Sequence, residues 1–538
     1  MTINTIHLLT RYWLFRQFYN PEQYGGKYKW NTLSHNGVLF PPEYIKHNIP
    51  VLYKNKPIIL DALSEEYATL YAKYLESEYI KSKVFNKNFW NDWKKILGKT
   101  HEIQSLEDCD FKKIYDYLLK QKELKKTLPK EVSDDKYKTA LLDGKPQPVG
   151  NYRIEPPGIF LGRGCNPQLG KIKRRIYPED IIINIGKESK IPDPLPNHKW
   201  KKVIHDRDVE WLASWKDDIT GKTKYVWLGS QSDFKAQSDQ QKFELARKLG
   251  KKINTIRKEN NVNLKSSDKK MKQTATALYF IDNFALRVGN EKSDEEADTV
   301  GVTSLRVEHI TLLDSNNVKL DFLGKDSVRY NKVLTVSQDI YDNLQEFMKD
   351  KSKHDDIFDK INSSDINKYL QSFMPDLTAK VFRTYNASRL FQDELNKISK
   401  KYQNYDEADK IDILLNEFNK ANAKVAMLCN HQKNISKSHN DQLDKLNEQI
   451  KELKSTIKTA TDAKAKKLKE RLTKLKAKKS LKIELKNISL GTSKINYIDP
   501  RITISFMKRN NLPINKLFTQ TLQDKFRWAF DTDENYEF

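Results

Sequence analysis

The segment LGTSKINYIDPR, residues 490 to 501, holds a tyrosine whose phenol could act as a nucleophile. Tyr497 stands between Asn496 and Ile498, where ordinary packing would explain it equally well. A phenol has a pKa of about 10 and is mostly protonated at neutral pH, so it needs neighbouring groups before it can attack phosphorus. The remainder of the sequence has to decide between the two interpretations.

Four cationic or titratable side chains stand in otherwise apolar segments upstream of this tyrosine. They are Arg287 in FALRVGNEK, Lys325 in DFLGKDS, Arg383 in KVFRTYNAS and His431 in LCNHQK. Taken singly, an arginine or lysine in such a segment is usually a surface cation or an ion-pair partner. A lone histidine is more often a satisfied structural residue than a catalyst. None of the four predicts an active site by itself.

Together with Tyr497, these segments resemble the eukaryotic type IB DNA topoisomerases, the nuclear DNA topoisomerase I family. The resemblance covers nearly everything after the first 26 residues and keeps the order of the family's motifs. The further motifs that carry it are YKWNTLSHNGVLFPPEY at 28–44, IEPPGIFLGRG at 154–164, KRRIYPEDIIIN at 173–184, TALYFIDNFALRVGNEK at 276–292, LTAKVFRTYNAS at 377–388, LGTSKINYIDPRIT at 490–503 and the final ENYEF.

The resemblance implies an active site in which Arg287, Lys325, Arg383 and His431 surround the nucleophile Tyr497. Two guanidiniums can hold the non-bridging phosphate oxygens with forked hydrogen bonds and stabilise the charge of the transition state. His431 would add a third donor, and Lys325 would protonate the departing 5′ oxygen. The covalent product would be a 3′-phosphotyrosine.

The same chemistry predicts that neither ATP nor a divalent metal is essential. The tyrosyl link keeps the energy of the broken phosphodiester, and fixed cations replace a metal ion. The segment GCNPQLGKI at 164–172 briefly looks like a nucleotide-binding loop. It has one residue too many between its glycines and ends in Ile172 where that loop needs serine or threonine. We interpret it as a loop that contacts the DNA backbone.

Four basic residues are predicted DNA contacts, namely Arg163, Lys171, Arg174 and Arg175 in FLGRG and KIKRR. By the resemblance they lie near the backbone, where phosphate contacts position the protein without reading sequence. The partner is therefore expected to be duplex DNA with little sequence preference. The alternative for the KRR cluster is a solvated surface patch.

Three positions match those at which family members contact camptothecin-type inhibitors in the nicked DNA. They are Arg163, Asp326 and Asn496, and the last two are thereby also predicted to lie at the DNA. The sequence thus predicts sensitivity to such drugs.

The composition agrees with a polyanionic partner. The 538 residues include 96 basic and 72 acidic side chains and carry a formal charge of +24, so nucleic acid is the first candidate and a merely soluble basic protein the alternative. Three separated cysteines support neither a disulfide framework nor a thiolate metal site, and a reducing compartment fits. We expect no signal peptide and no membrane-spanning segment.

Periodicity gives the main elements. Strands are expected near 180–185 and 209–215, and a helix over 272–290 that ends at Gly289 and Asn290. A strand pair is expected at 318–324 and 327–336, and a further helix over 377–395.

The clearest pattern lies between residues 436 and 486. Its apolar residues alternate spacings of three and four, which predicts two antiparallel helices joined near residue 461, with mostly lysine on their exposed faces. The seam residues are Leu443, Leu446, Ile450, Leu453, Ile457, Leu468, Leu472 and Leu475. We interpret this hairpin as a spacer with weak DNA contact.

The predicted fold is a multidomain α+β protein, and the resemblance implies a bilobed DNA clamp. Its expected parts are an N-terminal extension (1–26), a mixed β DNA-binding cap (27–232), a mainly helical, tyrosine-recombinase-like catalytic core (233–435), an antiparallel coiled-coil linker (436–486) and a small C-terminal domain with the tyrosine (487–538).

Some features depart from the family. Its nuclear members carry a long, charged N-terminal region, whereas about 26 dissimilar residues precede the core here. Leu161 stands where the family commonly has an arginine, and the hairpin is shorter. The nucleus is the expected compartment by family analogy. Heavy use of Lys, Asn, Ile and Tyr indicates an AT-rich genome, so a viral factory or virion of a large DNA virus is the alternative.

The expected activity is relaxation of supercoiled duplex DNA. A monomer would nick one strand, hold the 3′ end on Tyr497, allow rotation and reseal. The alternatives are a tyrosine recombinase, which uses similar chemistry, and a DNA clamp without catalytic activity.

Overall fold

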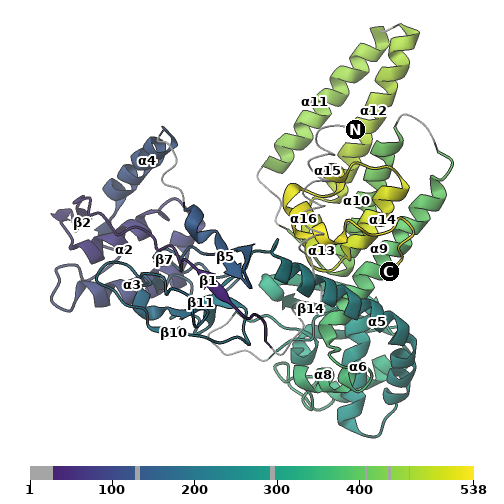
Figure 1. Cartoon of the computed structure of the whole chain (residues 1–538), viewed down its shortest axis with the longest axis horizontal. Helices are drawn as coiled ribbons and strands as arrows, with labels where there is room; N and C mark the ends of the chain where they lie inside the picture. Colours follow the sequence, from purple (N-terminus) through teal and green to yellow (C-terminus); the bar gives the residue numbers. More distant parts are fainter. Residues whose placement is uncertain (1–27, 128–133, 291–296, 406–408, 434–437, 460) are drawn as a thin grey trace. The chain divides into compact units, whose positions relative to one another are not determined.

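The computed structural model describes residues 28–127, 134–290, 297–405, 409–433, 438–459 and 461–538 (Figure 1). The expected N-terminal extension and the boundary at 435–436 lie outside these residues. The described chain is mixed α+β and divides into two compact units. Among the described residues, the first unit holds residues 28–237 together with 297–298. The second unit holds all the others from Ser238 onward.

The first unit contains several small sheets in place of one large sheet. Strand β11 pairs antiparallel with β9 and β12, and β10 joins β9 in parallel. The strands predicted near 180–185 and 209–215 are β9 and β11. In sheet order the strands are β1 (Leu33–His35), β5 (Thr139–Leu142) and β6 (Lys145–Pro148); β10 (Lys202–Ile204), β9 (Ile182–Asn184), β11 (Trp211–Lys216) and β12 (Thr223–Trp227); β3 (Lys56–Ile58), β2 (Val51–Tyr53) and β4 (Cys109–Asp110); and β7 (Gly158–Ile159) and β8 (Ile172–Lys173).

The helices of the first unit surround an aromatic core. Phe85, Phe89 and Trp93 recur every four residues along one helix and are fully buried. This spacing puts them on a single face, which is why the segment is helical and docks there. The helices are α2 (Ala62–Ala72), α3 (Lys83–Leu97) and α4 (Lys112–Thr127).

The second unit is mainly helical. Helix α9 crosses two hydrophobic cores, with Phe382 in one core and Phe391 in the other. Arg383 therefore lies where the two cores meet. The helices are α5 (Asp233–Asn263, which begins in the first unit), α6 (Lys269–Asn283), α7 (Gln338–Met348), α8 (Ser363–Gln371), α9 (Ala379–Lys401), α10 (Lys410–Leu428), α11 (Ser438–Thr459), α12 (Asp462–Glu484), α13 (Leu490–Asn496), α14 (Pro500–Arg509), α15 (Ile514–Leu517) and α16 (Gln520–Lys525).

One predicted helix ends early. Helix α6 stops at Asn283, six residues before the predicted stop at Gly289. Ala285 has a left-handed φ of 49°, which turns the chain out of the helix, and Phe284 and Leu286 both donate to the carbonyl of Phe280. The prediction was wrong here, and the consequence is that Arg287 lies on an irregular segment and not on a helix face.

The predicted strand pair is confirmed and belongs to a three-stranded sheet. Strands β14 (Asn317–Gly324) and β15 (Val328–Thr335) pair in register from Asn317 with Thr335 to Gly324 with Val328. The unpredicted strand β13 (Ile310–Leu313) adds to β14. The turn between β14 and β15 is a single 3₁₀ turn, Lys325–Ser327.

The predicted helical hairpin is also confirmed. Helices α11 and α12 run side by side (Figure 1), and Lys482 near the end of α12 donates to Gln442 near the start of α11, so the pair is antiparallel. Leu446 and Leu453 of the seam are buried. The charge differs from the expectation, because α11 has four basic and four acidic residues whereas α12 has ten basic and three acidic. Lysine is therefore concentrated on α12.

The C-terminal residues fold back onto α9 and α14. Tyr536 donates from its hydroxyl to Asp499 at 3.1 Å, and the Phe538 amide donates to Gln392 at 3.3 Å. Asp499 is fully buried and also pairs with Arg501. These contacts fix the backbone directly after Tyr497.

Candidate active site

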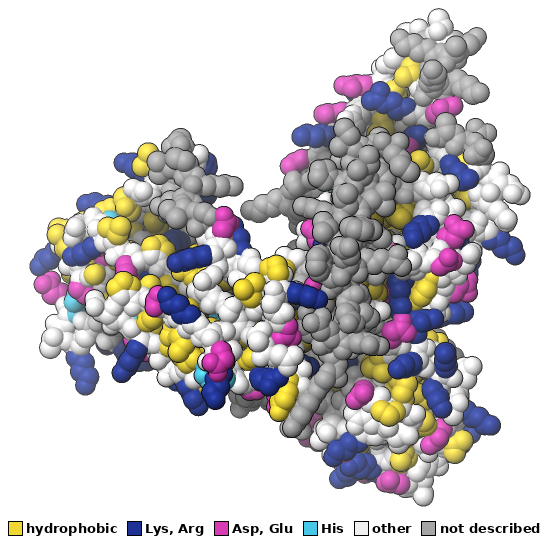
Figure 2. All heavy atoms as spheres, in the orientation of Figure 1, with side chains coloured by type: hydrophobic (Ala, Val, Ile, Leu, Met, Phe, Trp, Pro, Cys, Tyr) yellow, Lys and Arg dark blue, Asp and Glu magenta, His cyan; other side chains and the backbone are white. Residues whose placement is uncertain are grey.

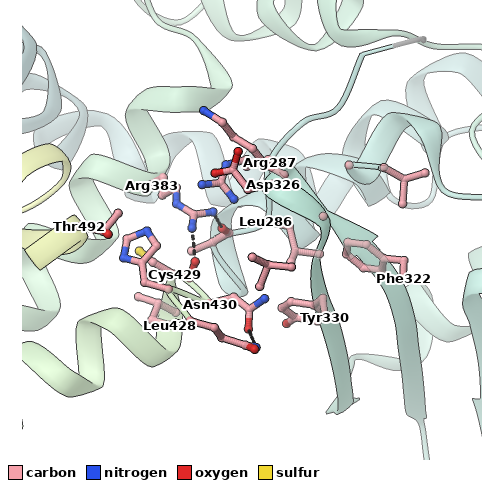
Figure 3. Close-up of a pocket in the computed structure, with 18 residues that line it drawn as sticks. Leu286, Arg287, Phe322, Asp326, Tyr330, Arg383, Leu428, Cys429, Asn430 and Thr492 are labelled. Atoms are coloured by element: carbon pink, nitrogen blue, oxygen red, sulfur yellow. Dashed lines mark hydrogen bonds between the residues drawn. The ribbon is translucent and has the colours of Figure 1, made fainter. Parts of the chain in front are cut away.

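A pocket in the second unit brings together four of the five predicted catalytic residues (Figure 3). Its volume is about 130 Å³. The walls come from the segment after α6, the β14–β15 turn, α9, the segment after α10, and α13. The predicted residues among its lining are Arg287, Lys325, Arg383 and His431.

Arg383 is the fixed cation of this pocket. It is 5% exposed, and its guanidinium donates to the carbonyl of Ala285 at 2.7 Å and to that of Cys429, as the dashed lines in Figure 3 show. Its Nε is buried and has no hydrogen-bond partner in the described part of the chain. Burial lowers the pKa of Arg383, yet a guanidinium stays charged in proteins. The Nε–H of this rigid cation is thus among the donors left for a ligand.

Two other cations of the pocket are less constrained by contacts. The side chains of Arg287 and Lys325 are exposed, and neither side chain makes a hydrogen bond or ion pair with any described residue. Figure 3 shows Arg287 beside Arg383, with Asp326 close by. Two neighbouring guanidiniums repel each other, so the pair favours an anion between them.

His431 is buried in the pocket wall. Its Nδ1 lies 2.7 Å from Oγ of Ser493, and its Nε2 is buried with no hydrogen-bond partner among the residues that the structure describes. Burial, followed by the charges of Arg383 and Arg287, lowers the pKa of His431 to about 3. The imidazole is therefore neutral at physiological pH.

Tyr497 packs behind His431 and is not among the described residues that line the pocket. Its ring stacks on His431 with centroids 5.4 Å apart, and the Arg383 guanidinium lies 5.1 Å from the ring centroid. It is partly buried and also contacts the core formed by α9, α10 and α14. The packing and the nucleophile interpretations are compatible, because the core holds the ring while two pocket residues flank it.

Two serines that the sequence interpretation did not single out hold the tyrosine segment. Ser388 of α9 donates to the carbonyl of Tyr497 at 2.9 Å and accepts from the Asp499 amide at 3.0 Å. The carbonyl of Ser493 accepts from the Tyr497 amide at 2.9 Å. Both serines stand within the motifs KVFRTYNAS and LGTSKINY, but serine type and spacing alone do not distinguish them from ordinary helical residues.

The predicted DNA contacts of the first unit differ in their surroundings. Arg163 is exposed and Lys171 half-buried in the loop between β7 and β8. Arg174 pairs with Asp180 at 2.8 Å and with Asp218.

Arg175 is a buried structural residue in this fold. It is 9% exposed, pairs with Glu66 at 2.7 Å and donates to the carbonyl of Pro42 at 2.8 Å. Its guanidinium is committed to the protein, so the geometry favours a packing role over the expected phosphate contact.

The predicted contacts of the second unit lie close to the pocket. Asp326 lines it and has a left-handed φ of 66° in the β14–β15 turn. Asn496 is the last residue of α13 and donates to the carbonyl of Thr492, another lining residue, at 3.1 Å.

No group of three or more His, Cys, Asp or Glu residues that could hold a metal occurs in the described part of the chain. The three cysteines are free thiols. Among the described helices, none is long and apolar enough to cross a membrane.

Comparison with family models finds three matches along the chain, the last two of which overlap at residues 469–479. Residues 28–228 match the DNA-binding fragment of eukaryotic DNA topoisomerase I, residues 231–479 match its catalytic core, and residues 469–538 match the C-terminal topoisomerase domain.

Curated relatives are similar over nearly the whole chain. DNA topoisomerase 1 of Caenorhabditis elegans is 44% identical, covering 95% of this chain and 68% of the relative. DNA topoisomerase 1 of Homo sapiens is 42% identical, covering 96% of this chain and 73% of the relative. DNA topoisomerase 1 alpha of Arabidopsis thaliana is 42% identical over 96% of this chain, which spans 60% of that relative's length.

Proposed function

The chain belongs to the eukaryotic DNA topoisomerase I family, and we propose that it is a type IB DNA topoisomerase, an ATP-independent isomerase that relaxes supercoiled duplex DNA. The observation that carries the proposal is the pocket of Arg287, Lys325, Arg383 and His431, with the Tyr497 ring against its wall. Buried donors without partners in a cationic pocket are suited to a phosphodiester.

Cleavage forms one bond and breaks one. The Tyr497 oxygen attacks phosphorus and its proton passes to water, while the bond to the 5′ oxygen breaks and that oxygen takes a proton from Lys325. Arg383 supplies an N–H held rigid by two carbonyls, and Arg287 supplies a second guanidinium to the same non-bridging oxygens. Neutral His431 donates a hydrogen bond and does not act as an acid.

Resealing is the reverse reaction. The freed 5′ hydroxyl attacks the 3′-phosphotyrosine and Tyr497 leaves. Because one phosphodiester replaces another, no nucleotide is consumed. The cations of the pocket carry the charge stabilisation, so a divalent metal is not essential in this proposal.

We also propose the expected domain organisation. Residues 27–232 form a cap and 233–435 a catalytic core that clamp DNA, the α11–α12 hairpin is the linker, and residues 487–538 supply the nucleophile. The boundary between the first two family matches, at residues 228 to 231, supports the division near residue 232. One chain supplies every proposed catalytic group, which favours a monomer. Contacts through phosphates would leave little sequence preference. The nucleus is the proposed compartment.

The test is relaxation of supercoiled plasmid with EDTA and without ATP. Wild-type protein should give a ladder of topoisomers, and Tyr497→Phe should bind DNA normally but give none, because it lacks the phenolic oxygen and keeps the ring packing. Relaxation by both proteins would overturn the assignment of Tyr497. DNA binding without relaxation by either would favour the non-catalytic clamp, and strand exchange between defined sites would favour a recombinase.

A further inference from the structure

Ser493 and His431 form a buried hydrogen bond that the mechanism above leaves unexplained. Ser493 is fully buried in α13, and its Oγ lies 2.7 Å from Nδ1 of His431. The two residues are 62 positions apart in the chain. The bond therefore connects α13, the helix that precedes Tyr497, to the segment that follows α10 and contains His431.

The surroundings decide which atom donates. If Nδ1 carried the proton and donated to Oγ, the serine hydroxyl would need an acceptor of its own. Within the described residues, Nδ1 of His431 is its one hydrogen-bond partner. The buried hydroxyl is satisfied when it donates to Nδ1, since an unsatisfied buried hydroxyl costs free energy.

The other ring nitrogen then carries the proton. Only one nitrogen of a neutral imidazole bears hydrogen, so an accepting Nδ1 leaves an N–H at Nε2. Nε2 is the buried atom that has no hydrogen-bond partner in the described chain. The charged groups that face the ring, Arg383 and Arg287, oppose a second proton.

We propose that Ser493 is a positioning residue for the reaction proposed above, because its hydroxyl fixes His431 in the neutral form that presents Nε2–H to the scissile phosphate. This inference rests on the proposed function for its catalytic consequence, whereas the hydrogen bond itself can be tested without DNA. The backbone of Ser493 has a separate role, since its carbonyl accepts from the amides of Tyr497 at 2.9 Å and Ile498 at 3.0 Å. A side-chain substitution leaves those two bonds available.

The kinetic test is a double-mutant cycle on single-turnover cleavage of a DNA duplex. Ser493→Ala should slow cleavage by about 10-fold, by analogy with the lower end of the loss caused by removing a partner that orients a metal-binding histidine. In a His431→Ala background the same substitution should change the rate by less than about 2-fold, because its effect passes through His431. An equal loss in both backgrounds, or no loss in either, would overturn the proposal.

A matched control is Ser189→Ala. It also removes a serine hydrogen bond, to the carbonyl of Leu33 at 2.8 Å, but Ser189 does not line the pocket. Its cleavage rate should equal that of the wild type. Thermal melting of each variant identifies a loss that comes from unfolding.

The spectroscopic test uses ¹⁵N-histidine-labelled wild-type protein without DNA. The His431 signals, assigned by their absence from His431→Ala, should show a neutral ring with the proton on Nε2 at pH 7. A proton on Nδ1, or a doubly protonated ring, would overturn the proposal even if Ser493→Ala fails to fold. If the wild type shows the Nε2–H form but cleaves no DNA, the proposed function fails and the hydrogen-bond assignment stands.

Discussion

Arg287 and Arg383 have the same side chain in opposite environments, and this predicts different consequences of removing them. Arg383 is buried and bridges the carbonyls of Ala285 and Cys429, whereas Arg287 is exposed. Either substitution by alanine should slow single-turnover cleavage about 100-fold or more, as loss of one transition-state donor does. Only Arg383→Ala should also lower the melting temperature, because it leaves two buried carbonyls unpaired.

Thermal melting and cleavage rates of both variants check this prediction. Arg389→Ala is a suitable control, since Arg389 lies on α9 with Arg383 but pairs with Asp393 at the surface. Equal melting temperatures for Arg287→Ala and Arg383→Ala would contradict the structural role of Arg383.

The low pKa of His431 predicts a pH dependence of stability. In the unfolded chain the imidazole takes up a proton below a pKa of about 6.5, whereas in the folded chain it stays neutral down to about 3. The unfolded state therefore binds more protons in this range, and stability falls as the pH is lowered through it. His431→Gln cannot titrate, so its free energy of unfolding should fall less steeply between pH 6.5 and 5. Parallel curves for the two proteins would show that His431 is not buried as neutral imidazole.

At the scale of elements, the long hairpin should affect the movement of DNA more than the bond chemistry. None of the pocket-lining residues belongs to α11 or α12. Removing one heptad from each helix keeps the apolar seam and the antiparallel pairing. Single-turnover cleavage should stay within about 2-fold of wild type, while the relaxation rate or the drug response changes. Loss of cleavage in a folded variant would contradict the spacer interpretation.

Periodic elements were predictable from the sequence, and their ends were not. The heptad spacing of apolar residues predicts α11 and α12, and the alternation of apolar and polar residues predicts β14 and β15, because each pattern repeats over many residues. The predicted helix runs past the end of α6 because the apolar spacing continues beyond Asn283, whereas Ala285 has a left-handed φ and its carbonyl accepts from Arg383, 98 residues away. Strand β13, ITLL, is too short to show alternation.

The candidate site was predictable as a set of residues and not as a geometry. Motif resemblance pointed to Arg287, Lys325, Arg383 and His431, which the structure brings to one pocket. The hydrogen bond between His431 and Ser493 joins residues that are 62 positions apart, so no local sequence pattern predicts it. Likewise, the KRR cluster gave no sign that Arg175 would be buried against a carboxylate.

At the scale of the whole molecule, basic and acidic side chains are intermixed on the face that Figure 2 draws. Figure 2 shows Lys and Arg side chains over both units with Asp and Glu among them. In the first unit, carboxylates neutralise several of the basic residues, as Glu155 does for Lys173 and Lys224. The net charge of +24 already includes these carboxylates, so what the pairing reduces is the number of the 96 basic side chains that are open to DNA.

Drug sensitivity is a prediction for the whole molecule, since the positions that match the family's inhibitor contacts are spread over both units. Arg163 belongs to the first unit, and Asp326 and Asn496 belong to the second. Camptothecin should make wild-type protein accumulate nicked plasmid, and Asp326→Asn should reduce that accumulation. Asparagine suits this position because it tolerates the left-handed φ of 66° while removing the charge. Unchanged resealing of DNA by the wild type in the presence of the drug would refute the prediction.

The folded-back C-terminal residues have a consequence for protein synthesis. Asp499, two residues after Tyr497, accepts a hydrogen bond from the Tyr536 hydroxyl. The amide of Phe538 donates a hydrogen bond to the side chain of Gln392 on α9. While the ribosome still encloses those last residues, the nascent chain lacks both contacts. The backbone after Tyr497 therefore gains this support only after Tyr536 and Phe538 have left the ribosome and docked.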